Sequence, residues 1–183
     1  MVSEQDKPLD AELVVTGATA AGFNAVLRKD LVAFVEKAFE TVSSGDVFRP
    51  NWHIQAIAHE LMGCHLGETR RLAILMPPRH LKSIIVSIAY VAWELGHDPR
   101  KRFIVVSHTA DLSQALARQF RQVVDSDWYR GVFPAMRASP QKNTEMEFVS
   151  SAGGGRLAIS IGGSITGRGG DVIIIDDPMK AEL

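Results

Sequence analysis

The stretch Arg71-Leu-Ala-Ile-Leu-Met-Pro-Pro-Arg-His-Leu-Lys-Ser83 says more about the fold than any other part of the sequence. Its apolar first half, residues 71–76, predicts a buried β-strand, and the two prolines that follow predict a loop. From Lys82 to about Leu95 the apolar pattern predicts a helix, which Gly96 ends. We therefore expect a strand, a loop and a helix in direct succession.

The loop and the start of this helix match part of a phosphate-binding pattern. Lys82 and Ser83 occupy the last two places of the template G-x-x-x-x-G-K-[ST], and Met76 and Leu81 stand at its two glycines. In such loops backbone N–H groups bind phosphate oxygens, the lysine neutralises phosphate charge and the hydroxyl binds Mg²⁺. A positive φ at Leu81 would cost roughly 1–2 kcal/mol, because leucine carries a Cβ. Alone, the pair Lys82-Ser83 is more typical of a solvated first helical turn.

A second segment, Val172-Ile-Ile-Ile-Asp-Asp177, places two carboxylates directly after an apolar run. Its four β-branched residues predict a buried strand, and open α/β sheets bind ligands at the carboxyl ends of their strands. We expect Asp176 to hold Mg²⁺ and Asp177 to orient or deprotonate an attacking water. The alternative is that the acidic pair only caps a turn before Pro178.

The remaining patterns alternate between the two kinds of secondary structure. Further strands are predicted at residues 102–107, 147–149 and 156–161, the last two as a hairpin around the glycines at 153–155. Further helices are predicted at residues 28–43, 51–66 and 110–125. This order predicts an α/β fold with a mainly parallel sheet, preceded by N-terminal helices. Residues 1–27 are expected to form a loosely ordered lead-in.

Composition excludes several classes of protein. The chain has 183 residues, a net charge of −1 and one cysteine, Cys64, so it has no intramolecular disulfide framework. The balanced charge gives no argument for nonspecific binding of nucleic acid. Its apolar runs are far shorter than the roughly 20 residues of a membrane-spanning helix. The acidic N-terminus is unlike a secretory signal, so we expect a soluble, intracellular protein.

Four segments carry a resemblance to a known family: Phe48-Arg-Pro-Asn-Trp-His-Ile-Gln55, the Arg71–Ser83 stretch, Val105-Val-Ser-His108 and Ile165-Thr-Gly-Arg-Gly-Gly-Asp-Val-Ile-Ile-Ile-Asp-Asp-Pro178. Together they resemble the N-terminal ATPase domain of tailed-phage terminase large subunits, the motors that pump DNA into a procapsid. The resemblance covers about residues 48–183 and keeps the order and spacing of the motifs. It implies a three-layer P-loop NTPase fold, with a helical lead at 28–67 and a core at 70–183.

The resemblance also implies roles for individual residues. The implied ATP-binding residues are Gln55, Trp52, Pro78, Arg79, His80, Leu81, Lys82 and Ser83, and the implied Mg²⁺ ligands are Ser83 and Asp176. The implied catalytic residues are Asp177, Arg79 at the γ-phosphate, and Arg168 reaching the nucleotide of a neighbouring subunit. Three of these residues have plainer alternatives: Trp52 as a core residue, Gln55 as a solvated helix residue and Arg168 as a brace of the glycine-rich loop.

Cofactors, partners and location follow from the same resemblance. It implies ATP and Mg²⁺ as cofactors. It also implies double-stranded DNA, a portal protein and a small terminase subunit as partners, a homo-oligomeric ring, and the bacterial host cytoplasm as the location. In the family one further strand inserts between those matching residues 71–76 and 172–175, and a nuclease domain follows. We therefore expect this chain to hold an incomplete ATPase domain without the nuclease.

Two other functions remain open from the sequence. One is a catalytically inactive terminase fragment that acts as an interaction piece, which the leucine at position 81 favours. The other is a different DNA-dependent, helicase-like P-loop ATPase, because the lysine and carboxylate pattern is common to both kinds of enzyme. Arg118, Arg121 and Arg130 are candidates for contact with DNA or a neighbouring subunit, although arginines of this kind are more often solvated.

Overall fold

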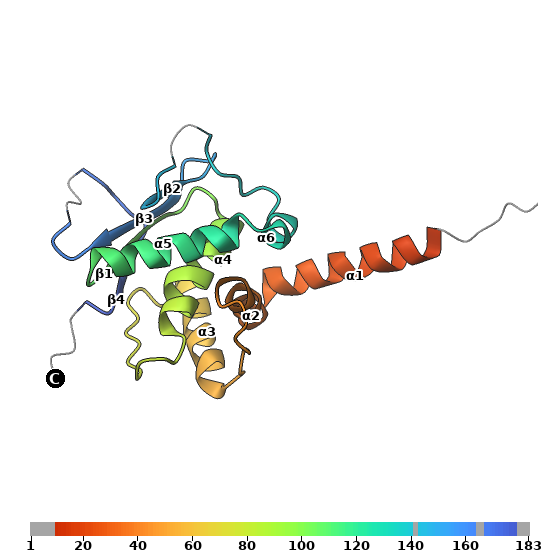
Figure 1. Ribbon diagram of the computed structural model, residues 1–183, viewed down its shortest axis with the longest axis horizontal. Helices are drawn as coiled ribbons and strands as arrows, with labels where there is room; N and C mark the ends of the chain where they lie inside the picture. Colours follow the sequence, from red (N-terminus) through yellow and green to blue (C-terminus); the bar gives the residue numbers. More distant parts are fainter. Residues whose placement is uncertain (1–9, 141–142, 164–166, 179–183) are drawn as a thin grey trace, which may run out of the picture.

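A mixed four-stranded sheet forms the centre of the protein. The structure, a computed structural model, describes residues 10–140, 143–163 and 167–178. The strands, in their order across the sheet, are β2 (Glu147–Val149), β3 (Gly155–Ser160), β1 (Arg102–Ser107) and β4 (Val172–Asp176) (Figure 1). β1 runs parallel to both β3 and β4, and β2 runs antiparallel to β3. The predicted α/β class and the predicted hairpin are confirmed.

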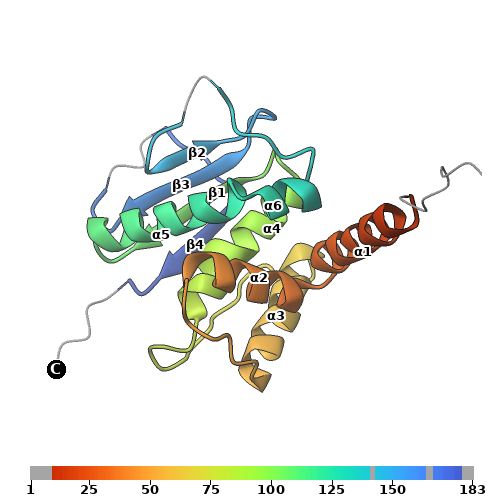
Figure 2. The same cartoon turned by 45° about the vertical axis from the view of Figure 1, so that its right-hand side comes forward.

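Six α-helices and one π-helix are present in the described part of the chain. They are α1 (Asp10–Lys29), α2 (Leu31–Val42), α3 (Trp52–His65), the π-helix η1 (Ile84–Tyr90), α4 (Val91–His97), α5 (Ala110–Val124) and α6 (Asp127–Val132). The side chain of Asp30 caps α2 by accepting hydrogen bonds from the backbone N–H groups of Val32 and Ala33. Figures 1 and 2 show α1 extending away from the rest of the protein. Residues 10–27, which were expected to belong to a loosely ordered lead-in, are helical.

One face of the sheet carries the helices. The register aligns Phe103, Val105 and Ser107 of β1 with Val172, Ile174 and Asp176 of β4, so these six side chains share a face. Helices α5 and η1 pack on that face. On the opposite face Ile173 and Ile175 are each 62% exposed. Within the described residues the strands thus have one helical layer, where the sequence predicted a three-layer fold.

The helical run that follows the proline-rich loop is the most buried element. Ile85, Ile88 and Ala89 of η1 are fully buried, and η1 contacts α2, α3, α5 and β4. Helix α6 is joined to α4 by Tyr129, whose hydroxyl donates to the backbone oxygen of Ala92 at 2.7 Å. Because packing surrounds η1, the residues just before it have a rigid support.

The predicted strand at residues 71–76 is not a strand in the structure. The segment is extended, and its side chains alternate: Leu72, Ile74 and Met76 are partly buried, while Leu75 is 89% exposed. It has no ladder partner among the described residues, because a cavity separates it from β4. The period-two pattern was correct, but a strand also requires a neighbour to which its backbone can bond.

No helix among the described residues has both the length and the apolar character needed to cross a bilayer.

Candidate functional site

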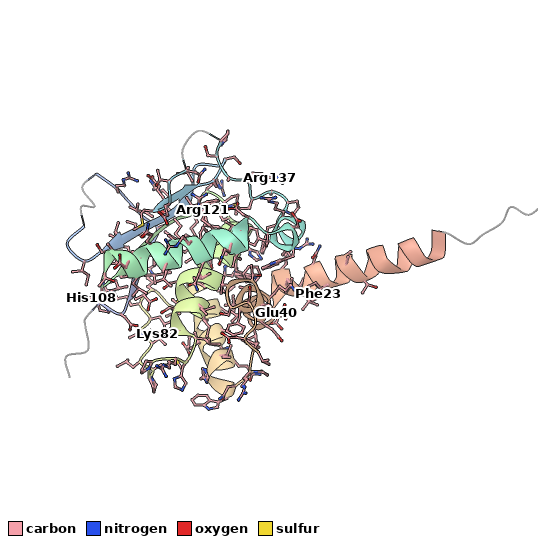
Figure 3. All side chains as sticks on the ribbon, in the orientation of Figure 1. Phe23, Glu40, Lys82, His108, Arg121 and Arg137 are labelled. Atoms are coloured by element: carbon pink, nitrogen blue, oxygen red, sulfur yellow. The ribbon has the colours of Figure 1, made fainter. Side chains whose placement is uncertain are left out.

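The structure brings Lys82 together with Asp176, the last residue of β4, and with Asp177, which follows it and lies 95 residues from Lys82 in sequence. Lys82 Nζ donates to Asp177 Oδ1 at 2.5 Å and lies 4.0 Å from Asp176 Oδ1. Figure 3 labels Lys82. The Lys82 side chain is 23% exposed, and it begins the helical run that contains η1. The site therefore holds one cation beside two anions where a loop, a helix start and a strand end meet.

The two carboxylates have different surroundings. Asp176 is 4% exposed, and its Oδ2 accepts a hydrogen bond from Ser87 Oγ at 2.8 Å. The Asp177 side chain is 59% exposed, and it meets Lys82 from the solvent side. A buried carboxylate that is held in place suits a metal ligand, whereas an exposed one is free to move toward a substrate.

Backbone strain is concentrated at this site. The non-glycine residues with positive φ in the described part of the chain are Arg79 (67°), Leu81 (61°) and Asp177 (45°). A left-handed conformation costs roughly 1–2 kcal/mol for a residue with a Cβ, and such strain clusters at functional sites. Leu81 thus occupies the conformation that the missing glycine would have favoured. Its side chain packs against the hydrophobic core, which helps to hold the strained loop in place.

A cavity of about 700 Å³ opens from the Lys82 site and lies between β4 and the extended segment. Its lining residues are Leu61, Cys64, Gly67, Thr69, Arg70, Leu72, Ile74, Lys82, Val86, Tyr90, Lys101 and residues 171–178. Lys82, Asp176 and Asp177 lie at one end, and Cys64, Tyr90 and Lys101 lie at the other. The cavity is large enough for a nucleotide-sized ligand.

A second, more apolar pocket of about 470 Å³ lies between the extended segment and α3. Trp52, His53, Leu75 and His80 are among its lining residues. Trp52 is 76% exposed, so its alternative assignment to the core is wrong. The ring centroids of His80 and His53 lie 5.5 Å apart. Nδ1 of His80 lies 2.9 Å from the backbone oxygen of Pro78. This pocket offers aromatic surfaces beside the loop.

Other predicted site residues lie apart from these groups. Gln55 is exposed on α3 and does not line either cavity. Arg79 is exposed and forms no ion pair with a described residue. Ser83, the predicted Mg²⁺ ligand, is partly buried at the start of the helical run. The hydroxyl that donates to Asp176 is that of Ser87.

Arg168 lies at the opposite edge of the sheet from Lys82. It forms an ion pair with Glu147 on β2, whereas Lys82 meets the residues at the end of β4. Within this chain Arg168 is therefore remote from the candidate site. The three arginines considered for DNA contact also have partners: Arg118 pairs with Glu145, Arg121 donates to Asn143, and Arg130 pairs with aspartates of its own segment.

A polar cluster at the far end of the cavity was missed from the sequence. Glu94 is 1% exposed; its Oε1 lies 2.7 Å from His65 Nδ1, and its Oε2 accepts from Lys101 Nζ at 2.5 Å. Burial, reinforced by Glu94, raises the pKa of the Tyr90 hydroxyl well above its ordinary value. Burial likewise raises the pKa of the Cys64 thiol. The available signal was one acidic residue within the apolar helical run.

The end of β1 holds buried polar atoms next to Asp176. Ser107 pairs with Asp176 in the β1–β4 register, and its Oγ is buried without a hydrogen-bond partner among the described residues. The same holds for Nδ1 of His108, which Figure 3 labels beside the start of α5. Arg156, on the same face, lies over the Phe120 ring. Burial lowers the pKa of Arg156 to about 9, and Asp176 opposes that shift.

Among the described residues, no group of three or more His, Cys, Asp or Glu side chains converges to bind a metal ion. A Mg²⁺ that arrives with a nucleotide needs only one or two carboxylates, because phosphates and waters complete its shell. The oxygen donors of Asp176, Asp177 and Ser83 fit that requirement. A comparison with protein-family models and with curated proteins finds no match to this chain.

Proposed function

We propose that this chain binds and hydrolyses ATP with Mg²⁺. The observation that carries the proposal is the contact of Lys82 with both Asp176 and Asp177 beside a strained loop. Phosphoryl transfer depends mainly on positioning and charge neutralisation, and this constellation provides a cation for phosphates and carboxylates for metal and water. Mg²⁺ supplies charge neutralisation on the phosphate oxygens when bound.

Each residue of the candidate site then has a role in binding or hydrolysis. Lys82 exchanges its contact with Asp177 for the phosphates, which releases Asp177 to orient or accept a proton from the attacking water. Asp176 and Ser83 would hold Mg²⁺, and the exposed Arg79 is free to reach the γ-phosphate. The base would lie in the pocket beside Trp52. Gln55 does not line that pocket, so the geometry gives no support for a role of Gln55 in reading the base.

A larger proposal concerns the whole machine. We propose that the fold is the partial core of a P-loop ATPase and that it serves as the motor of a terminase-like DNA-packaging complex. The order of the motifs supports this, as does the cavity between β4 and the extended segment, whose facing backbone edges lack ladder partners in the described part of the chain. Double-stranded DNA, a portal protein and a small terminase subunit would be its partners. In a homo-oligomeric ring Arg168 would serve a neighbouring subunit's nucleotide.

Calorimetric titration of Mg²⁺-ATP into the purified chain tests the first proposal. Lys82→Ala should weaken binding about 10–100-fold, since a hydrogen bond to a charged group contributes roughly 1.5–3 kcal/mol. Lys37→Ala is the matched control, because Lys37 pairs with Glu40 on the surface of α2, away from the site. Saturable binding by both variants with equal affinity would refute a phosphate-binding role for Lys82. Absence of binding by a wild-type chain whose circular dichroism shows it folded would refute the ATPase proposal itself.

Stimulation of ATP hydrolysis by double-stranded DNA tests the motor proposal separately. If the chain hydrolyses ATP and DNA leaves the rate unchanged at low salt, the ATPase proposal stands and the DNA-coupled role of this chain is wrong.

A further inference from the structure

The hydroxyl of Ser87 is the group that fixes the buried carboxylate of the site. Ser87 Oγ donates to Asp176 Oδ2 at 2.8 Å, Ser87 is fully buried, and Asp176 is 4% exposed. The other oxygen, Oδ1, faces Lys82 Nζ at 4.0 Å, which is too long for a hydrogen bond. Asp176 is therefore held on one side and open on the side of the cavity.

The π-helix explains why Ser87 reaches this position. An α-helix turns about 100° per residue, so five residues would place Ser87 about 140° around the axis from Lys82. A π-helix bonds residue i to residue i+5, which brings residues five apart close to the same face. Because η1 begins directly after the Lys82-Ser83 pair, Lys82 and Ser87 both address Asp176. Wide turns of this kind occur often at functional sites.

We infer that Ser87 is a positioning residue for the divalent cation of the site: its hydroxyl holds Oδ2 of Asp176, so that Oδ1 points toward the metal. The inference rests on the proposed function, because it assumes that a nucleotide-bound Mg²⁺ meets Asp176. The partners that orient a ligating carboxylate typically affect metal affinity 10–100-fold, although they do not touch the metal. A purely structural hydroxyl would affect folding stability instead and leave metal affinity unchanged.

The test measures metal affinity directly. The full chain is incubated with a non-hydrolysable ATP analogue and titrated with Mn²⁺, and free Mn²⁺ is followed by electron paramagnetic resonance. Ser87→Ala should bind Mn²⁺ about 10–100-fold more weakly than wild type. Ser113→Ala is the matched control, because it removes a hydroxyl that is equally buried and donates at 2.6 Å to the Ile159 oxygen, away from Asp176. The control should bind Mn²⁺ within about two-fold of wild type.

A second variant and a second readout separate the outcomes. Ser87→Cys replaces the hydroxyl by a slightly larger thiol that donates weakly, so its Mn²⁺ affinity should fall between wild type and Ser87→Ala. If Ser87→Ala does not fold, the cysteine variant decides the question. Affinity for the analogue with EDTA present should stay within about two-fold in every variant. Mn²⁺ affinity in both Ser87 variants equal to that of the Ser113 control overturns the inference and leaves the proposed function intact. Absence of metal-dependent binding in wild type overturns both.

Discussion

Replacement of Leu81 by glycine and by alanine tests whether the backbone at this position is strained. The test depends on which of the two variants has the larger free energy of unfolding. In an ordinary helix glycine is less stable than alanine by roughly 0.5–1 kcal/mol, because the unfolded chain gains freedom. At Leu81, where φ is 61°, alanine keeps the strain and glycine removes it. Relief of roughly 1–2 kcal/mol exceeds the entropic loss, so Leu81→Gly should be more stable than Leu81→Ala by about 0.5–1 kcal/mol.

Wild type is not the useful reference in this experiment, because both variants lose the packing of the leucine side chain against the core. The difference between the two variants cancels that loss. Urea unfolding followed by circular dichroism measures it, provided that both variants show the same dependence on denaturant. Ala25→Gly, at an exposed position of α1, serves as the control and should lose about 0.5–1 kcal/mol. If Leu81→Ala is the more stable variant, the loop is unstrained and the reasoning fails.

The same two variants also report on the ligand. Since the strain at Leu81 is already present without nucleotide, its relief alone does not change affinity. Tighter Mg²⁺-ATP binding by Leu81→Gly than by Leu81→Ala would therefore mean that the Cβ itself hinders the approach of backbone to phosphate. Equal affinity would mean that leucine is no obstacle at this position.

Three further predictions concern other parts of the fold. Gly155→Ala should lower the free energy of unfolding in urea by about 3 kcal/mol or more, because a Cβ would lie 2.0 Å from the Phe148 oxygen. The control Gly169→Ala, where a Cβ meets open space, should be near neutral, and equal losses in the two variants would contradict the prediction. Glu94→Gln should lose roughly 3 kcal/mol, because the buried Glu94 carboxylate is the ion-pair partner of Lys101 and the amide leaves that charge uncompensated; a loss below 1 kcal/mol would contradict it. Burial raises the pKa of Tyr129, so the phenol stays neutral in the folded chain and ionises above pH 10 only when unfolded. Stability should therefore fall more steeply with pH above 10 in wild type than in Tyr129→Phe, by about 1.4 kcal/mol per pH unit, and equal slopes would contradict this.

Local patterns predicted several elements close to their observed bounds. Apolar periodicity located α2, α3 and α5, and four consecutive β-branched residues located β4. The approach of Lys82 to Asp176 and Asp177 also followed from local rules, because ligand sites of open α/β sheets lie where the carboxyl ends of strands meet the starts of helices. These rules use only short stretches of sequence, such as one apolar run and the polar residues that follow it. One sequence without an alignment therefore suffices to apply them.

The same rules could not predict the contacts that Ser87 and Glu94 make in the site. Periodicity of 3.6 residues places Ser87 on a different face from Lys82, and nothing in residues 84–90 identifies the π-helix that corrects this. Glu94 was recognisable only as an acidic residue in an apolar run; its partners, His65 and Lys101, come from α3 and from the residue before β1. Identification of either residue needed the tertiary structure.

The segment at residues 71–76 shows the limit most clearly. Its alternating burial is that of a strand, and it lines one cavity together with β4, yet its backbone forms no ladder with any described residue. A β-strand is a relation between two backbones, so sequence periodicity can predict the face of a strand but not the presence of its partner. If a strand were to pair in this cavity, the exposed edge of β4 and the extended segment would both gain ladder bonds. Amide hydrogen exchange provides the test: in the chain as it stands the N–H groups of residues 71–76 should exchange faster than those of β1, and protection equal to that of β1 would mean that the segment is already paired.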